Sequence, residues 1–198
     1  MTEYYSPGVY IEQIANSVPL IGESPSVGGM IGITHRGALN TPLLVTSWTD
    51  FIEKFAYGLD TPFLDSSDLP HAVYGFFQNG GTACYVNRIA HSTAAKAFKA
   101  IGGVGNEVTF TALEEGTWGN AIKIAISANV ATPANFDVSV YLVSDGVDVL
   151  MEFIKDLSNT STDAKFYPNK INGRSMYISV NTTGDLAVNS ATALTGGV

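Results

Sequence analysis

The side chains that could do chemistry are few and widely spaced in this chain. The three histidines are His35, His71 and His91, and none has a metal-binding side chain three or four residues further on, the spacing that places two ligands on one helical face. His71 lies within one helical turn of Asp68, but an aspartate at the start of a helix is usually structural. The sequence therefore predicts no metal site and no cofactor.

The single cysteine, Cys84, lies inside the apolar, strand-like run ACYVNRIA. One cysteine cannot form an intramolecular disulfide, and a catalytic thiol needs an exposed site with a positioned histidine. Cys84 is therefore predicted to be a buried and unreactive thiol.

The carboxylates do not form an acid–base pair in the sequence. Glu114 and Glu115 are adjacent and precede a glycine, which predicts a solvated turn. An acid and a base at one site need two different environments, and adjacency alone does not provide them. Asp65 and Asp68 flank two serines, but their spacing does not match that of a calcium-binding loop.

The glycine-rich stretches lack the order that a phosphate site requires. GGVGNEV, residues 102–108, is expected to follow a helix and precede a strand, the reverse of a dinucleotide-binding loop, and is interpreted as a domain junction. The Gly-x-Ser-x-Gly motif of serine hydrolases does not occur. We therefore predict no catalytic residue and no enzymatic activity; a hydrolase or a ligand-binding domain whose site is built from distant residues is the alternative.

The composition favours a protein that makes large contacts with other proteins. Only 14% of the 198 residues are charged, against about 25% in an ordinary soluble domain, and 45% are apolar. The net charge of −8 and the absence of any run of Lys or Arg argue against direct binding to nucleic acid. The chain shows no secretory signal and no apolar run of about 20 residues. We therefore expect that the protein is made in a cytoplasm and does not insert directly into a membrane.

Residues 1–22 are predicted to be an extended arm. Pro7, Gly8 and Pro19 disfavour a helix, while Val9, Tyr10 and Ile11 favour a strand. One short strand is not stable alone, so this segment must join a sheet, either in its own domain or in another copy of the chain.

Residues 23–103 are predicted to form an α/β domain with a parallel component. VGGMIGIT at 27–34, the run after Pro42 and ACYVNRIA read as strands.

Three helices are expected in this part of the chain. The first is capped by Ser47, with Asp50 three residues on, and has its aromatic and apolar residues at helical spacing. The second is capped by Asp68 and ends at Asn79-Gly80-Gly81. The third, capped by Ser92, covers TAAKAFKAI, carries Lys96 and Lys99 and ends at Gly102-Gly103.

Residues 104–198 are predicted to form a β-rich domain. AIKIAIS, FDVSVYLV and SMYISV alternate apolar and polar side chains, the pattern of antiparallel strands with one buried face. Asp145-Gly146 predicts a hairpin, and a short helix is expected near 152–157. The small and polar final residues resemble a linker. The expected fold class is therefore α+β, with an N-terminal arm, an α/β domain that lacks a C-terminal portion, and a β-rich second domain.

Several stretches together resemble the tail sheath proteins of contractile-tailed phages, R-type bacteriocins and related contractile injection systems. YYSPGVYIEQI resembles the start of the family, and GGMIGITHRGALNTPLLVTSWTDFIEKFA resembles its next block. AVYGFFQNGGTACYVNRIA is the most specific match, and EEGTWGNAIKIAI resembles the start of an inserted domain. FDVSVY, MEFIKDLS and INGRSMYISV match more weakly but occur in the right order. Family members continue beyond the terminal LTGG into a further portion.

The resemblance implies a structural subunit of a contractile sheath and divides the chain into a linking arm at 1–22, a sheath core part at 23–103 and an inserted domain at 104–198. Six copies would form a ring, and rings would stack around an inner tail tube above a baseplate and contract to drive the tube through a cell envelope. The location implied is the tail of a virion or contractile particle assembled in a bacterial cytoplasm. A tube or baseplate component of the same machine is the alternative. The arm would link subunits by adding a strand to a neighbour's sheet. The residues that resemble the linking arm are Tyr4, Tyr5, Pro7, Gly8, Val9, Tyr10 and Ile11.

Overall fold

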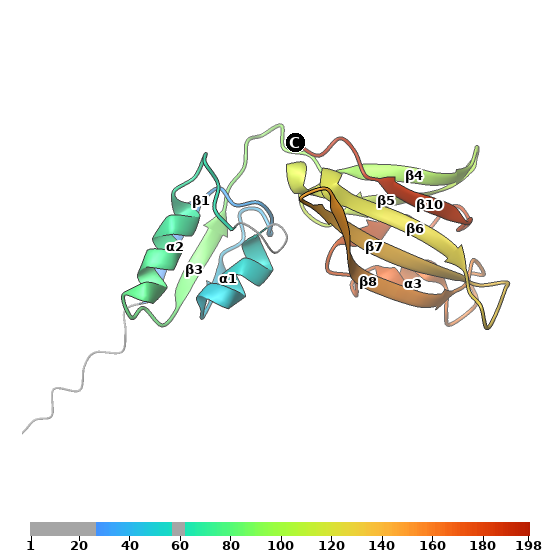
Figure 1. Cartoon of the computed structure of the whole chain (residues 1–198), viewed down its shortest axis with the longest axis horizontal. Helices are drawn as coiled ribbons and strands as arrows, with labels where there is room; N and C mark the ends of the chain where they lie inside the picture. The colour runs from blue at the N-terminus through green and yellow to red at the C-terminus, as the bar shows by residue number, and fades with distance from the viewer. Residues whose placement is uncertain (1–26, 57–61) are drawn as a thin grey trace, which may run out of the picture.

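The computed structural model describes residues 27–56 and 62–198, and these form two units joined end to end (Figure 1). The predicted arm at 1–22, with its expected strand, lies outside the described residues. The first unit is a small sheet with two helices, and the second is a larger β-structure, so the fold is α+β as predicted.

The first unit is built on three strands, β1 (Gly28–Gly32), β2 (Leu43–Val45) and β3 (Cys84–Arg88). Their order is β1-β3-β2, with β1 parallel and β2 antiparallel to β3. The predicted parallel component is confirmed.

Helix α1 (Trp48–Phe55) begins where the sequence predicted it. The Ser47 hydroxyl accepts a hydrogen bond of 3.1 Å from the Asp50 backbone N–H, which is the capping contact expected from the spacing. The Asp50 carboxylate accepts from the Thr46 N–H, one residue before the cap, and also pairs with Lys54. Phe51 and Phe55 are buried against the sheet.

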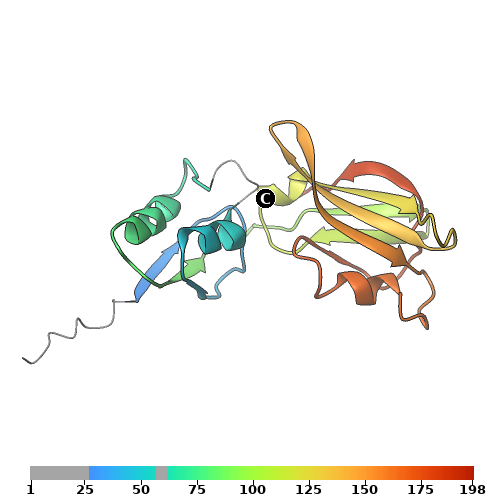
Figure 2. The same cartoon turned by 60° about the horizontal axis from the view of Figure 1, so that its bottom comes forward.

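Helix α2 (Leu69–Gln78) packs on the same face of the sheet as α1, which leaves the other face without a covering helix (Figure 2). Asp68 occupies the position before the helix, but the prediction that its side chain caps is wrong. Its backbone is already helical, and the Ser67 hydroxyl accepts from the Leu69 N–H instead. Gly80 has a φ of +87°, in agreement with the predicted helix end.

The predicted third helix does not form. Residues Phe98–Gly103 are strand β4, which pairs with β5 (Asn106–Ala112) in an antiparallel hairpin, so Lys96 and Lys99 do not lie on a helix. GGVGNEV is therefore the turn of this hairpin rather than a domain junction. Alanine and lysine favour a helix, but this preference amounts to only about 0.5 kcal/mol per residue. Pairing with the Thr- and Val-containing strand β5 outweighs it.

The second unit is two sheets packed face to face. One has the order β10-β6-β7-β8 and the other β4-β5-β9. The strands not yet placed are β6 (Ile122–Ala128), β7 (Phe136–Ser144), β8 (Val147–Leu157), β9 (Ile178–Val180) and β10 (Asn189–Ala193), and a 3-10 helix, η1, covers Thr117–Ala121.

The predicted alternation of β6 and β7 is confirmed. Ile122, Ile124 and Ile126 are at most 1% exposed and face the core between the sheets. Val138 and Val140 of β7 face the same core from the neighbouring strand. This core is separate from the one beneath α1 and α2.

Of two local features predicted in the β-rich unit, the turn is confirmed and the short helix lies elsewhere. Asp145 and Gly146 both have positive φ and form the β7–β8 turn, as predicted. The short helix expected at 152–157 is wrong, because β8 continues through these residues by pairing with β7; the short helix is α3 (Tyr167–Ile171).

The final residues are not a linker. Asn189–Ala193 pair with β6, Leu194 is fully buried, and Val198 exchanges backbone hydrogen bonds with Ala95. Small polar residues form this strand because an edge position exposes half of their side chains. In the part of the chain described, no helix is long and apolar enough to cross a membrane.

Candidate functional site

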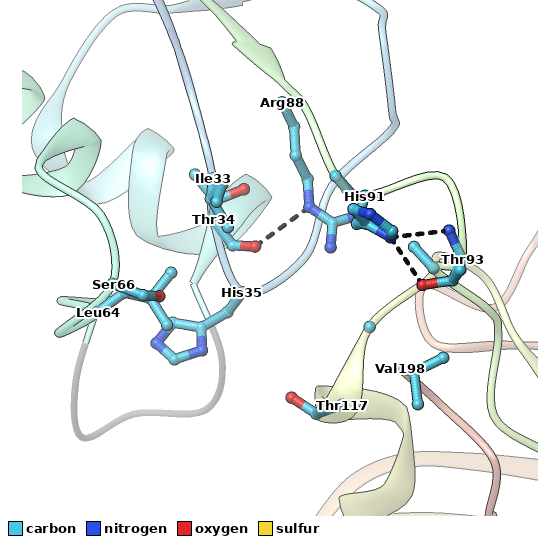
Figure 3. Close-up of a pocket in the computed structure, with 13 residues that line it drawn as sticks. Ile33, Thr34, His35, Leu64, Ser66, Arg88, His91, Thr93, Thr117 and Val198 are labelled. Carbon is cyan, nitrogen blue, oxygen red and sulfur yellow. Dashed lines mark hydrogen bonds between the residues drawn. The ribbon is translucent and has the colours of Figure 1, made fainter.

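The junction between the two units holds two buried charged side chains, Arg36 and Arg88. It is formed by the loop that follows β1, by the end of β3 and, from the β-rich unit, by residues 113–118 and 176–177. Figure 3 shows Arg88 reaching from β3 towards the Thr34 backbone at the edge of this junction.

Arg88 donates to three backbone carbonyls, two in its own unit and one in the β-rich unit. Its Nε donates to Thr34 O at 3.1 Å, its Nη1 to Gly37 O at 3.0 Å and its Nη2 to Glu115 O at 2.8 Å. The side chain is only 3% exposed, and burial lowers the pKa of the guanidinium, an effect that the carboxylates of Glu115 and Glu114 oppose. The planar fork of arginine suits this task because it presents several donors in fixed directions.

Arg36 inserts into the β-rich unit from the first unit. Its guanidinium carbon lies over two aromatic rings, 5.3 Å from the ring centroid of Trp118 and 5.0 Å from that of Tyr177, within the range of a cation–π contact. Its Nη2 donates a long hydrogen bond of 3.4 Å to Met176 O. Arg36 is 8% exposed.

Glu114 is the acidic partner in this junction rather than the solvated turn residue that the sequence predicted. Its Oε2 lies 4.0 Å from Arg36 Nε. Burial raises the pKa of this carboxyl above its usual value, while Arg36, Arg88 and Lys96 act to lower it. Arg36 Nε, Glu114 Oε2 and Trp118 Nε1 are all buried without a hydrogen-bond partner among the described residues. The two charged groups therefore lie at the long end of ion-pair distances and share no hydrogen bond.

A cavity of about 240 Å³ opens beside Arg88, between the units. Figure 3 shows His35 directed towards Ser66 and His91 towards Thr93, from two different elements. His91 Nδ1 lies 2.8 Å from Thr93 Oγ1, and His35 Nε2 lies 3.3 Å from Phe63 O. Burial is the main cause that lowers the pKa of His35. These contacts fix each ring locally and do not align a nucleophile with a base.

The other residues considered from the sequence are structural. Cys84 is fully buried and burial raises the pKa of its thiol, as expected for an unreactive cysteine. The His71 ring stacks on Phe63 with centroids 4.4 Å apart. Within residues 27–56 and 62–198, no three His, Cys, Asp or Glu side chains are grouped as metal ligands would be.

Besides the junction and its cavity, the structure has an exposed apolar surface on the uncovered face of the three-stranded sheet. Ile31, Leu44 and Tyr85, one from each strand, are 69%, 43% and 47% exposed. Asn87 on β3 has a side-chain oxygen that is buried and has no hydrogen-bond partner among the described residues. Such a face is suited to contact with another protein surface.

In this arrangement, Arg88 and Arg36 each contact the β-rich unit from the first unit. Sequence reasoning did not identify Arg36 or Arg88 as functional, and the seven arm residues from Tyr4 to Ile11 lie outside the described residues. The available signal was Arg88 itself, a cation that ends a buried strand and so requires fixed partners.

No protein-family model matches this chain, and no curated protein matches it. Solved structures do. A sheath tail protein from Desulfitobacterium hafniense is 21% identical with a TM-score of 0.58, over 96% of this chain and 39% of that chain. A sheath tail protein from Listeria innocua is 22% identical with a TM-score of 0.60, over 88% of this chain and 35% of that chain. The chain thus spans less than two fifths of the length of these structures, and the resemblance seen in the sequence is confirmed at the level of the fold.

Proposed function

We propose, from a fold shared with two sheath tail proteins, that this protein is a structural subunit of a contractile tail sheath. The observation that carries the proposal is the likeness to the Desulfitobacterium hafniense protein, which covers both units and not the α/β unit alone. A fold can host several functions, so the assembly described next is part of the proposal.

In this function six copies form a ring around an inner tail tube, and rings stack into a helix above a baseplate. Contraction moves each subunit as a body and buries more surface between subunits, which drives the tube through a cell envelope. The free energy is stored during assembly, so no nucleotide or cofactor takes part. The low charge of the chain and its exposed apolar sheet face support large contacts between subunits.

The junction would serve this motion. A subunit transmits force only if its units keep their relative orientation, and Arg88 and Arg36 connect them through buried hydrogen bonds and ring stacking. The β-rich unit would face outwards, away from the tube.

The arm would link neighbouring subunits. An extended peptide gains main-chain hydrogen bonds at an open sheet edge without needing a pocket, and the three-stranded sheet has β1 and β2 at its edges. Val9, Tyr10 and Ile11 would form the added strand.

The first test is electron microscopy of native particles labelled with an antibody against residues 104–198. Label along the outside of a striated tail is expected. Label confined to a baseplate or tail tip would favour the alternative component of the same machine. Absence of label from every particle would remove the structural role.

The second test examines the role of the arm in sheath assembly, using the full-length protein. Deleting residues 1–22 should leave a folded body and abolish sheath assembly, and Val9→Pro or Ile11→Pro should weaken assembly because proline removes a ladder donor. Ser17→Pro, outside the strand-like run, is the control. Sheaths of normal length from the deletion would contradict the role of the arm.

A further inference from the structure

The open edge of β8 is the longest uncovered strand edge in the β-rich unit. β8 ends the sheet β10-β6-β7-β8, and its 11 residues pair only with β7 in the described structure (Figure 1). Proteins normally shield such an edge, because its unpaired N–H and C=O groups bind other strands. At β8 the shielding is partial.

On the outer side of the sheet, apolar side chains lie beside this edge. Leu150 and Phe153 are 52% and 47% exposed, and each is paired with a β7 residue on the outer face. The ammonium of Lys155 lies 4.9 Å from the Phe153 ring centroid. This side of the edge therefore offers apolar surface next to a cation.

On the inner side, a groove of about 240 Å³ separates β8 from α3 and the loop after it. It is lined by Glu152, Phe153, Ile154, Lys170, Arg174 and Ser175. The one carboxylate in the groove is already engaged, since Glu152 accepts from the Ser175 hydroxyl at 2.6 Å and from the Met176 N–H at 2.7 Å. The groups left to receive a ligand are the cations of Lys170 and Arg174.

The positive charge at this edge contrasts with the acidity of the whole chain, whose net charge is −8. Lys54, Lys123 and Lys165 form ion pairs with nearby aspartates. In the described ranges, Lys155, Lys170 and Arg174 form none, and all three lie around the β8 edge. Asp156, an acid on which the charge of Lys170 also acts, is paired with Lys165.

We propose that the β8 edge binds an extended segment of a partner protein in which apolar and acidic residues alternate. Side chains of an added strand point alternately to its two sides. Apolar residues would then contact Leu150 and Phe153 on the outer side, and carboxylates would meet Lys170 and Arg174 on the groove side. Main-chain hydrogen bonds would supply the affinity, and the two sides would supply the specificity. This surface belongs to the β-rich unit and not to the three-stranded sheet.

The test uses the 198-residue chain and a fluorescein-labelled peptide in which valine alternates with aspartate. Anisotropy should show saturable binding that weakens with salt, because the contact is partly ionic. Lys170→Glu combined with Arg174→Glu should weaken binding about tenfold or more by reversing the charge. Lys99→Glu on β4 makes one such charge reversal away from the groove and should leave binding unchanged. Leu150→Thr, at an exposed outer-face position that does not line the groove, tests the outer side independently and should also weaken binding.

Two further peptides complete the test. A peptide with proline at its central valine should bind weakly, because the ladder bond is lost, and one with lysine in place of aspartate should not bind. The proposal is overturned if the proline peptide binds as tightly as the first, if the charge-reversed protein binds unchanged, or if no saturable binding occurs. It is also overturned if the protein alone forms dimers that the double variant abolishes, since a second copy would then be the occupant.

Discussion

Arg88 Nη2 donates a hydrogen bond of 2.8 Å to the carbonyl oxygen of Glu115, across the boundary between the two units. The same guanidinium holds the loop after β1 through Thr34 and Gly37. One side chain at the end of the central strand therefore fixes both the loop of its own unit and the backbone of the next. A connection made of backbone carbonyls needs no particular partner side chain, only the arginine.

Arg88→Met should destabilise the protein by about 3–5 kcal/mol, because it leaves three buried carbonyls without their donor. Arg88→Lys keeps the charge but not the fork, and should recover only part of the loss. Urea unfolding measures both. Lys99→Met is the control for the loss of a positive charge elsewhere. Equal stability of Arg88→Lys and the wild type would contradict a role for the arginine fork.

The sequence predicted those parts of the fold that depend on near neighbours. Helix α1 was found because Ser47 and Asp50 are three residues apart and the buried Phe51 and Phe55 four apart. The β7–β8 turn was found because Asp145-Gly146 tolerates positive φ. Each of these signals involves residues no more than four positions apart in the sequence.

Apart from the Asp68 cap, which the adjacent Ser67 replaces, the errors arose where pairing with another strand decides the structure. The run at 93–101 has the composition of a helix, yet Phe98 pairs with Thr111 and bridges Thr195. The junction could not be predicted for the same reason. Arg36 meets Trp118 and Tyr177, and no local pattern relates residues so far apart in the sequence.

Gly116→Ala should destabilise the protein by more than the cost of its positive φ alone. Gly116 has a φ of +124°, and a Cβ there would lie 3.1 Å from Arg88 Nη2, so the fork would have to shift. Gly105 is the matched control, because its φ is +86° and a Cβ at this position would have no atom within 4 Å. Gly105→Ala should cost about 1–2 kcal/mol from strain, and Gly116→Ala should cost more in thermal unfolding. Equal losses would show that crowding at Arg88 is absent.

Glu114→Gln should stabilise the protein at neutral pH, and the gain should vanish in acid. Burial raises the pKa of Glu114 in the folded state above its unfolded value, against the opposing effect of Arg36. The ionised carboxylate therefore costs stability at neutral pH, and the cost is relieved as the pH falls through the folded pKa towards the unfolded one. Unfolding midpoints across this pH range measure the difference. Glu107→Gln, at an exposed strand position, is the control for the loss of a carboxylate elsewhere.

Trp118 fluorescence should report whether Arg36 holds the units together. Trp118 is 3% exposed and Arg36 stacks on it, while the other tryptophan, Trp48, lies in the first unit. In a Trp48→Phe background, Arg36→Met should shift the Trp118 emission to the red, because loss of the stacked cation loosens the junction and admits water. The free energy of unfolding should fall by about 1–2 kcal/mol.

The same substitution tests the contact between Arg36 and Glu114. Removing Arg36 leaves Glu114 buried without its partner, so adding Glu114→Gln should restore part of the lost stability. The double-mutant cycle gives the coupling energy between the two residues. An unshifted emission maximum, with additive effects of the two substitutions, would contradict the view that Arg36 and Glu114 act as one contact across the junction.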